Sequence, residues 1–289
     1  MNRTENLEVP VFPEKGSIAR SLPTVSIQRQ FSAAEIKACL STKIFGKWTH
    51  VFEKIDSTNE EATRLAEQGA KEGTLVLAEC QTKGRGRLGR TWHSPAGLGI
   101  WMSVVLRPKL APIAAPGLSL VAGLSLARTI EECLQTPVEL KWPNDCLLGG
   151  KKTAGILAEL SAQRENVRFV VLGVGVNVLH QPQDFPPELQ KTATSLVLAT
   201  GQLIDRVEFL CEFLKRLEAD YSQFKKQGLA PFIDSYTRRC ELIGSQIQAH
   251  VGHKTITGQA LRIDATGALV LRQGQKEIVI SAGEAQRIR

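Results

Sequence analysis

The chain has 289 residues, of which 43% are hydrophobic and 22% are charged, a balance typical of a globular protein with a sizeable core. Its formal net charge of +7 favours an anionic partner, which leaves nucleic acid, a phosphorylated small molecule and an acidic protein surface open. The six cysteines are widely spaced without a C-x-x-C pair, which argues against a disulfide framework or a zinc site and favours a reducing, cytoplasmic setting.

The first 30 residues contain three prolines and no lasting periodicity, so we expect residues 1–30 to be a mobile tail. They also lack the apolar stretch of a signal peptide. Ordered structure is expected from Ser32, because Ser32 and Glu35 fit a capping box and Ile36 and Leu40 share one helical face. A strand over 48–55 and a helix that begins at Ser57 should follow.

Further apolar runs and helical periods continue the same pattern. Strands are expected at 74–78, 99–106, 138–142, 154–160 and 168–178, and long helices at about 117–134 and 206–226. The segment 110–127 has no charged residue, but its prolines, glycines and serines favour a buried core helix over a membrane span. Together the elements predict a mixed α+β domain over residues 31–238.

After Arg239 the strands become short and the turns frequent. Strands are expected at 246–251, 255–263, 268–272 and 277–281, with glycines or Asp-Ala-Thr-Gly between them. This spacing is typical of a small β-barrel, so we place a second domain at 239–289.

The most distinctive segment is the basic loop Gly84-Arg-Gly-Arg-Leu-Gly-Arg90, which Lys83 precedes. Glycines let the backbone approach a ligand closely, and arginines offer planar donors for phosphate or carboxylate. Because the like charges repel, the loop should be poorly ordered until an anion binds. It lacks the Gly-Lys-Ser/Thr of a Walker A loop and the context of a dinucleotide fingerprint. Phosphate or nucleotide binding, RNA binding and a merely solvated loop all remain open.

Three other segments carry polar groups next to predicted strands. Lys141-Trp-Pro-Asn-Asp145 offers a cation together with oxygens that suit Mg²⁺, although a simple turn with a packed Trp142 is an equal alternative. In Lys151-Lys-Thr-Ala-Gly155, a lysine enters a strand whose glycine permits close approach, and we interpret Lys151 as solvated. In 173–178, Asn177 interrupts an apolar strand and needs a partner, from the protein or from a ligand.

The order of these segments, with Ser57-Thr-Asn59 and Gln81 before the basic loop, resembles the catalytic domain of biotin–protein ligases over residues 31–238. The terminal part, with 268–271 and Ser281-Ala-Gly-Glu284, resembles the SH3-like domain that follows in that family. The resemblance implies a mixed-sheet catalytic domain of the biotin/lipoate ligase type and a small SH3-like barrel. It also implies a two-step reaction, in which biotin and ATP give biotinyl-5'-AMP and a lysine of a biotin carboxyl carrier domain, as in acetyl-CoA carboxylase, then takes the biotinyl group.

The resemblance also implies roles for individual residues. Biotin would contact Ser57, Thr58, Asn59, Gln81, Arg85, Gly86, Arg87 and Lys152. ATP and the adenylate would contact Arg87, Arg90, Lys141, Asn144, Asp145 and Asn177, with Asp145 as the Mg²⁺ ligand. Lys152 would bridge the biotin carboxylate and the phosphate, and Lys152 and Arg87 would be the catalytic residues. No protein nucleophile is needed, because both nucleophiles come from substrates.

The chain departs from parts of the family pattern. Some members carry an N-terminal winged helix-turn-helix, but about 30 irregular residues are too few for one, so no DNA binding is expected. The family's C-terminal glutamate matches Glu284 weakly, and neither Arg287 nor Arg289 is assigned. Lipoate–protein ligase and a nucleic-acid-binding regulator are the rival functions. The oligomeric state stays open, with a homodimer as one alternative.

Overall fold

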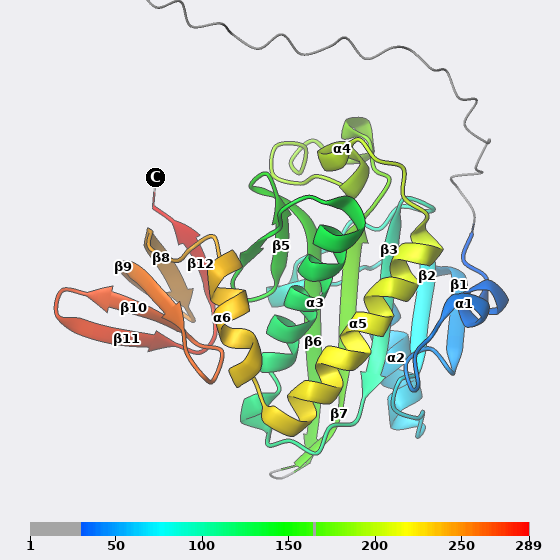
Figure 1. The fold of residues 1–289 in the computed structure, drawn as a ribbon, viewed down its shortest axis with the longest axis horizontal. Coiled ribbons are helices and arrows are strands. Elements are labelled where there is room, and N and C mark those ends of the chain that lie inside the picture. Colours follow the sequence, from blue (N-terminus) through cyan, green and yellow to red (C-terminus); the bar gives the residue numbers. More distant parts are fainter. Residues whose placement is uncertain (1–29, 164–165, 289) are drawn as a thin grey trace, which may run out of the picture.

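The computed structural model describes residues 30–163 and 166–288, so the predicted tail lies almost wholly outside the described residues. Two sheets make up the fold (Figure 1). The larger has seven strands in the order β1-β2-β3-β7-β6-β5-β4, and the smaller has five in the order β11-β10-β9-β8-β12. In the larger sheet β1 pairs with β2 in parallel and every other pair is antiparallel. The predicted α+β class, a mixed sheet followed by a small β unit, is confirmed.

The helices and strands have the following bounds. The large sheet contains β1 (Thr49–Ile55), β2 (Leu75–Gln81), β3 (Gly99–Leu106), β4 (Glu139–Lys141), β5 (Asp145–Leu148), β6 (Lys151–Gln163) and β7 (Asn166–Asn177). The helices are α1 (Ala33–Cys39), α2 (Thr58–Glu67), α3 (Gly117–Leu134), α4 (Leu196–Thr200), α5 (Arg206–Gln227) and α6 (Ala230–Arg239). The small sheet contains β8 (Gln246–Val251), β9 (Lys254–Ile263), β10 (Leu269–Gln273), β11 (Lys276–Ile280) and β12 (Glu284–Arg287).

Both faces of the large sheet are covered, which explains why its central strands are continuous apolar runs. Leu75 and Leu77 belong to the main core, which lies beneath α3 and α5. Val76 points to the opposite face, where it packs with Ala62 and Ala66 of α2. Alternate residues of one strand therefore serve two different layers, and α2 stands on the face opposite the long helices (Figure 1).

Helix α3 confirms the prediction of a core helix at 117–134. With the turn before it, Pro112–Leu134 is long and apolar enough to cross a membrane, but 72% of its most apolar window is buried inside the protein. Its neighbours explain this burial, because α5, α6 and strands β4 to β6 all contact it.

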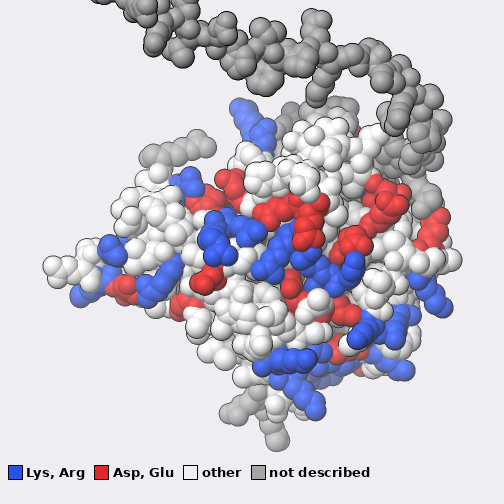
Figure 2. Space-filling view, in the orientation of Figure 1, with Lys and Arg blue, Asp and Glu red and all other residues white. Residues whose placement is uncertain are grey.

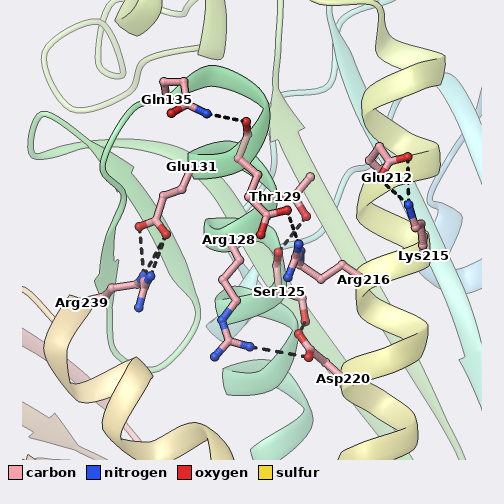
Figure 3. A network of polar contacts seen from close by, with 11 residues as sticks. Ser125, Arg128, Thr129, Glu131, Gln135, Glu212, Lys215, Arg216, Asp220 and Arg239 are labelled. Atoms are coloured by element: carbon pink, nitrogen blue, oxygen red, sulfur yellow. Dashed lines mark hydrogen bonds and ion pairs between the residues drawn. The ribbon is translucent and has the colours of Figure 1, made fainter.

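Polar contacts fix α3 against the two helices beside it (Figure 3). Asp220 of α5 accepts a hydrogen bond from the Ser125 hydroxyl at 2.7 Å and lies 3.6 Å from the Arg128 guanidinium. Arg239, the last residue of α6, pairs with Glu131 at 2.7 Å. Each partly exposed ion pair contributes little to the free energy of unfolding. We infer that these contacts mainly determine how α5 and α6 are oriented against α3. The Arg239–Glu131 pair also fixes the end of α6, from which the chain continues to the first strand of the small sheet, β8.

The small sheet docks on the turn that contains Pro143, whose peptide bond with Trp142 is cis. The buried Trp142 indole donates to the Gly267 carbonyl at 2.9 Å. On the face shown in Figure 2, lysines and arginines are interspersed with acidic residues, so the excess positive charge forms no single-sign patch there.

Most predicted elements are confirmed, and the exceptions are short. Four short elements, β5, α4, α6 and β12, were not predicted, because they carry neither the capping pattern that marks α1 and α2 nor a clear alternation. The expected helix at Ser32 forms as α1, but the Ser32 side chain makes no capping hydrogen bond. At α2 the Ser57 hydroxyl does accept from the Glu60 N–H, at 3.5 Å, and Gly69 adopts a left-handed conformation (φ 89°) after the helix end.

Candidate functional site

One cleft of about 840 Å³ collects all the residues that the sequence singled out. It lies between the start of α2, the basic loop, the strands β6 and β7, and the edge of β12. Its lining includes Ser57, Thr58, Asn59, Gln81, Arg85, Gly86, Arg87, Arg90, Lys141, Asn144, Asp145, Lys152 and Asn177. Residues from six separate segments thus converge on one cavity, although nothing but their order connected them in the sequence.

The floor of the cleft is backbone, because three glycines replace side chains there. A Cβ atom on Gly173 would lie 2.0 Å from the Asn59 Oδ1 atom. A Cβ on Gly175 would lie 2.4 Å from the Trp92 indole nitrogen, and one on Gly155 would lie 2.9 Å from the same ring. The glycines therefore let Asn59 and Trp92 lie directly on the sheet.

Buried polar groups line the cleft where α2 begins. Ser57, Thr58 and Asn59 are each no more than 5% exposed. The Gln81 Oε1 atom accepts from both the backbone N–H and the hydroxyl of Thr58, at 2.8 and 3.1 Å. Its Nε2 atom donates to Ser94 at 2.9 Å. Since these groups hold one another in place, they form a fixed polar wall that suits a neutral polar ring.

The basic loop is closed by its own backbone. The Gly86 N–H donates to the Arg90 carbonyl at 2.7 Å, and the Trp92 N–H donates to the Gly84 carbonyl at 2.8 Å. Leu88, at the tip, has a φ of 56° and is 72% exposed. The tip is therefore a tight turn that presents its arginines to the cleft rather than packing them.

The three arginines of the loop differ in their partners. Arg87 donates to Asn144 Oδ1 at 3.2 Å and to the Gly283 carbonyl at 3.1 Å. Burial lowers the pKa of Arg87, although an arginine stays charged at neutral pH. Arg90 pairs with Glu284, and Arg85 pairs with Glu159 at 3.0 Å. These carboxylates offset the repulsion within the loop, a compensation that the sequence did not reveal. Whether the free loop is disordered stays a prediction.

Lys152 lines the cleft beside Asp145 and Trp92. Its Nζ atom lies 2.7 Å from Asp145 Oδ1 and 5.1 Å from the centroid of the Trp92 ring. Its backbone is held on both sides, because its N–H donates to Thr192 and its carbonyl accepts from Thr194. The neighbouring Lys151 is exposed, as the sequence indicated.

Lys141, Asn144 and Asn177 also line the cleft. The Asn144 amide also donates to the Ile156 carbonyl at 2.9 Å, so its oxygen is fixed toward Arg87. Asn177 is 5% exposed and donates to the Thr194 carbonyl at 3.1 Å. The sequence left open whether Asn177 has a partner from the protein or from a ligand, and the protein supplies one.

The comparisons with known proteins agree with this geometry. Residues 51–177 match the model of the biotin/lipoate A/B protein ligase family, and residues 242–287 match the biotin protein ligase C terminal domain. The bifunctional ligase/repressor BirA of Bacillus subtilis is 39% identical over 278 residues, which are 96% of this chain and 84% of that protein. The chain belongs to the biotin protein ligase family.

Other relatives of this ligase chain give the same result. The biotin–[acetyl-CoA-carboxylase] ligase of Mycobacterium tuberculosis is 38% identical over 239 residues, which cover 81% of this chain and 86% of that protein. The solved biotin protein ligase from Aquifex aeolicus, in complex with biotin and ATP, superposes with a TM-score of 0.73. It shares 33% identity, and the match covers 84% of this chain and 100% of the Aquifex chain.

The structure adds residues to the cleft of this ligase that the sequence reasoning did not assign. Trp92, His93, Phe185, Lys191 and Glu241 line it, and Ser94 and Ser103 support it from behind. A signal existed for Trp92 alone, as the aromatic residue that directly follows the basic loop. The others lie in loops or strands where nothing local separates a site residue from an ordinary polar one.

A buried histidine supports the loop that carries Phe185. His180 is fully buried and stacks on Phe185 with a centroid distance of 4.8 Å. Burial, with a smaller effect from His93, lowers the pKa of His180 to about 4, so the ring is neutral at physiological pH. A neutral ring packs against aromatic neighbours without an uncompensated charge.

Proposed function

We propose that this chain is an ATP-dependent, AMP-forming biotin–[biotin carboxyl carrier protein] ligase. In the first step a biotin carboxylate oxygen attacks the α-phosphate of ATP, which forms biotinyl-5'-AMP and releases pyrophosphate. In the second step a lysine amine of the carrier domain attacks the acyl carbon, forms an amide and releases AMP. The observation that carries the proposal is the convergence of a polar ring wall, Lys152 and Arg87 in one cleft.

The biotin ring would bind where α2 begins. The wall of Ser57, Thr58 and Gln81 offers fixed hydroxyl, amide and backbone groups to a neutral ureido ring, and Asn59 stands beside it. A helix N-terminus also presents backbone N–H groups that no intrahelical carbonyl satisfies. The backbone of Arg85 and Gly86 would cover the ring from the loop side.

The reacting groups would meet between Lys152 and Arg87. When two anions approach, charge accumulates at the carboxylate and the phosphate, and nearby fixed cations stabilise it. Lys152 would leave Asp145 to bridge the two groups, while Arg87 and Arg90 would hold the adenylate phosphate. The remaining rate enhancement would come from alignment of the two substrates.

ATP would extend from Lys152 toward Lys141, Asn144 and Asn177. Asp145 is the carboxylate that could hold an accompanying Mg²⁺ ion, which would neutralise the phosphates. Among the residues that the structure describes, no three His, Cys, Asp or Glu side chains form a metal cluster. A single carboxylate still fits Mg²⁺, because this ion takes most of its ligands from phosphates and water.

The proposed partners are biotin, ATP and a carrier domain, in the cytoplasm. All six cysteines are free thiols, which fits a reducing compartment. We expect no DNA binding, and a self-associated form is an outcome for measurement rather than part of the proposal.

The test is pyrophosphate exchange into ATP. We expect exchange that depends on biotin and is absent with lipoate. Exchange with lipoate alone would support lipoate–protein ligase instead. Salt-dependent binding of duplex DNA or RNA without any exchange would favour a nucleic-acid-binding regulator.

A further inference from the structure

Arg85 differs from the other loop arginines because two carboxylates neutralise it. Its guanidinium lies 3.0 Å from Glu159 Oε1 and 3.6 Å from Glu60 Oε1. Arg87, by contrast, contacts an amide oxygen and a carbonyl oxygen. A cation already compensated by two anions is a poor anchor for a third, so Arg85 serves the loop better as an attachment point.

Glu159 contacts both the basic loop and the start of α2, which together enclose the place where the biotin ring would bind (the biotin-ring pocket). Its second carboxylate oxygen, Oε2, accepts a hydrogen bond from the Asn59 amide at 2.7 Å. Asn59 in turn accepts from the Ser103 hydroxyl at 2.6 Å and rests on Gly173. One carboxylate on β6 therefore joins the basic loop to the start of α2, with one oxygen for each.

The position of Glu159 indicates that this link is specific. It stands on the α2 face of the sheet, opposite Val171 in the register of β6 and β7, and its side chain is 29% exposed. A carboxylate beside apolar sheet residues loses hydration, and it is stable there because charged and polar partners compensate it. Glu159 belongs to neither the reacting groups nor the lining of the cleft, so its effect must act through Arg85 and Asn59.

We propose that Glu159 is a positioning residue that ties the basic loop, through Arg85, to the biotin-ring pocket, through Asn59. The inference rests on the proposed function. The link holds the loop over the biotin-ring pocket in one position, so its loss weakens retention of biotin and of biotinyl-AMP. It leaves the chemistry at Lys152 and Arg87 intact.

The test uses Glu159→Ala, Glu159→Gln, Arg85→Ala and the double variant of Glu159 and Arg85 to alanine. Glu159→Ala should raise the KM for biotin in pyrophosphate exchange, and speed release of preformed biotinyl-AMP, by roughly three- to tenfold. The kcat of exchange should change less than about twofold, because the lost contact stabilises the bound substrate and the transition state equally. Glu159→Gln should be intermediate, because the amide keeps an oxygen for Asn59 but offers Arg85 no charge.

The double variant decides whether the two residues act together. Its loss should be smaller than the sum of the two single losses, because both changes remove the Arg85–Glu159 contact. The control is Arg64→Ala, which removes the Glu61–Arg64 pair of α2 outside the cleft and should change neither quantity.

Additive losses, or a lower Tm with unchanged KM and release, would reduce Glu159 to a structural residue and overturn the inference. Absence of biotin-dependent exchange in the wild-type protein would overturn the proposed function and this inference with it. Normal wild-type exchange with an unaffected Glu159→Ala overturns the inference alone.

Discussion

At the scale of single residues, the cations of the cleft differ in the groups that they contact. Lys152 is paired with a single carboxylate, Asp145, and its backbone is fixed by hydrogen bonds to 192–194. Arg87 has only neutral hydrogen-bond partners and is partly buried. The charge of Arg87 would thus be available to an anion, whereas Lys152 would exchange Asp145 for the two anions whose developing charge it would stabilise.

Substitution of the two cations should separate formation of biotinyl-AMP from its retention in the cleft. Lys152→Ala should slow biotin-dependent pyrophosphate exchange by about 10²-fold or more, since a preorganised charge is lost at the reacting centre. Arg87→Ala should chiefly speed the release of biotinyl-AMP, measured by trapping the free adenylate. Lys151→Ala is the matched control, because this lysine is adjacent but exposed. An unchanged exchange rate in Lys152→Ala would remove that residue from its role.

The buried imidazole of His180 predicts a pH dependence of stability. Its pKa is lowered to about 4 by burial, whereas an unfolded histidine has a pKa of about 6.5. Between these values the unfolded chain binds more protons, so the free energy of unfolding should fall by about 3 kcal/mol as the pH drops through this window. His93 and Asp184 are the charged or titratable neighbours.

Denaturant unfolding of wild type and His180→Phe at pH 4 to 7 measures this contribution. The phenylalanine keeps a ring against Phe185 but cannot titrate, so the difference in stability between the two proteins should depend on pH. A constant difference across the window would show that His180 does not contribute in this way.

At the scale of elements, periodicity sufficed where an element was long or strongly patterned. Strand β3 and helix α3 were predicted with the bounds that the structure shows, and β8 likewise. The sequence predicts no strand at β5, because Asn144-Asp145 also fits a turn and the three residues that follow carry no alternation. Helix α6 follows Gly228 and includes Pro231, which obscured it.

The basic loop illustrates the limit of local reasoning. Its charge pattern predicted disorder through repulsion, but Glu159 and Glu284, which lie 69 or more positions away along the chain, bring opposite charges to it. Such partners become adjacent only through the fold, so no window of sequence reveals them.

Amide hydrogen exchange of the loop tests how far these partners order it. Exposed ion pairs are screened in salt, so exchange within 84–92 should quicken at about 1 M salt in the absence of substrates. Biotin and ATP together should slow it, since an adenylate would add contacts to Arg87 and Arg90. Equal exchange in the free and substrate-bound protein would contradict the proposed role of the loop as a cover.

At the scale of the whole molecule, the small sheet completes the cleft. The Gly283 carbonyl accepts from Arg87, Glu284 pairs with Arg90, and Gly267 accepts from Trp142. The sequence singled out residues that the structure gathers in one cleft, because glycines, arginines and Trp-Pro-Asn-Asp stand out individually. It could not show that Glu284 would meet Arg90, since this contact joins two folding units.

Biotin transfer to a carrier domain is the most direct test of the proposed activity. The purified chain, biotin, ATP and Mg²⁺ are incubated with a biotin carboxyl carrier domain, and intact mass and peptide mapping follow the product. We predict one biotinyl group on the acceptor lysine, dependent on ATP, with no transfer when lipoate replaces biotin. A carrier that stays unmodified, or one that takes lipoate instead, would contradict it.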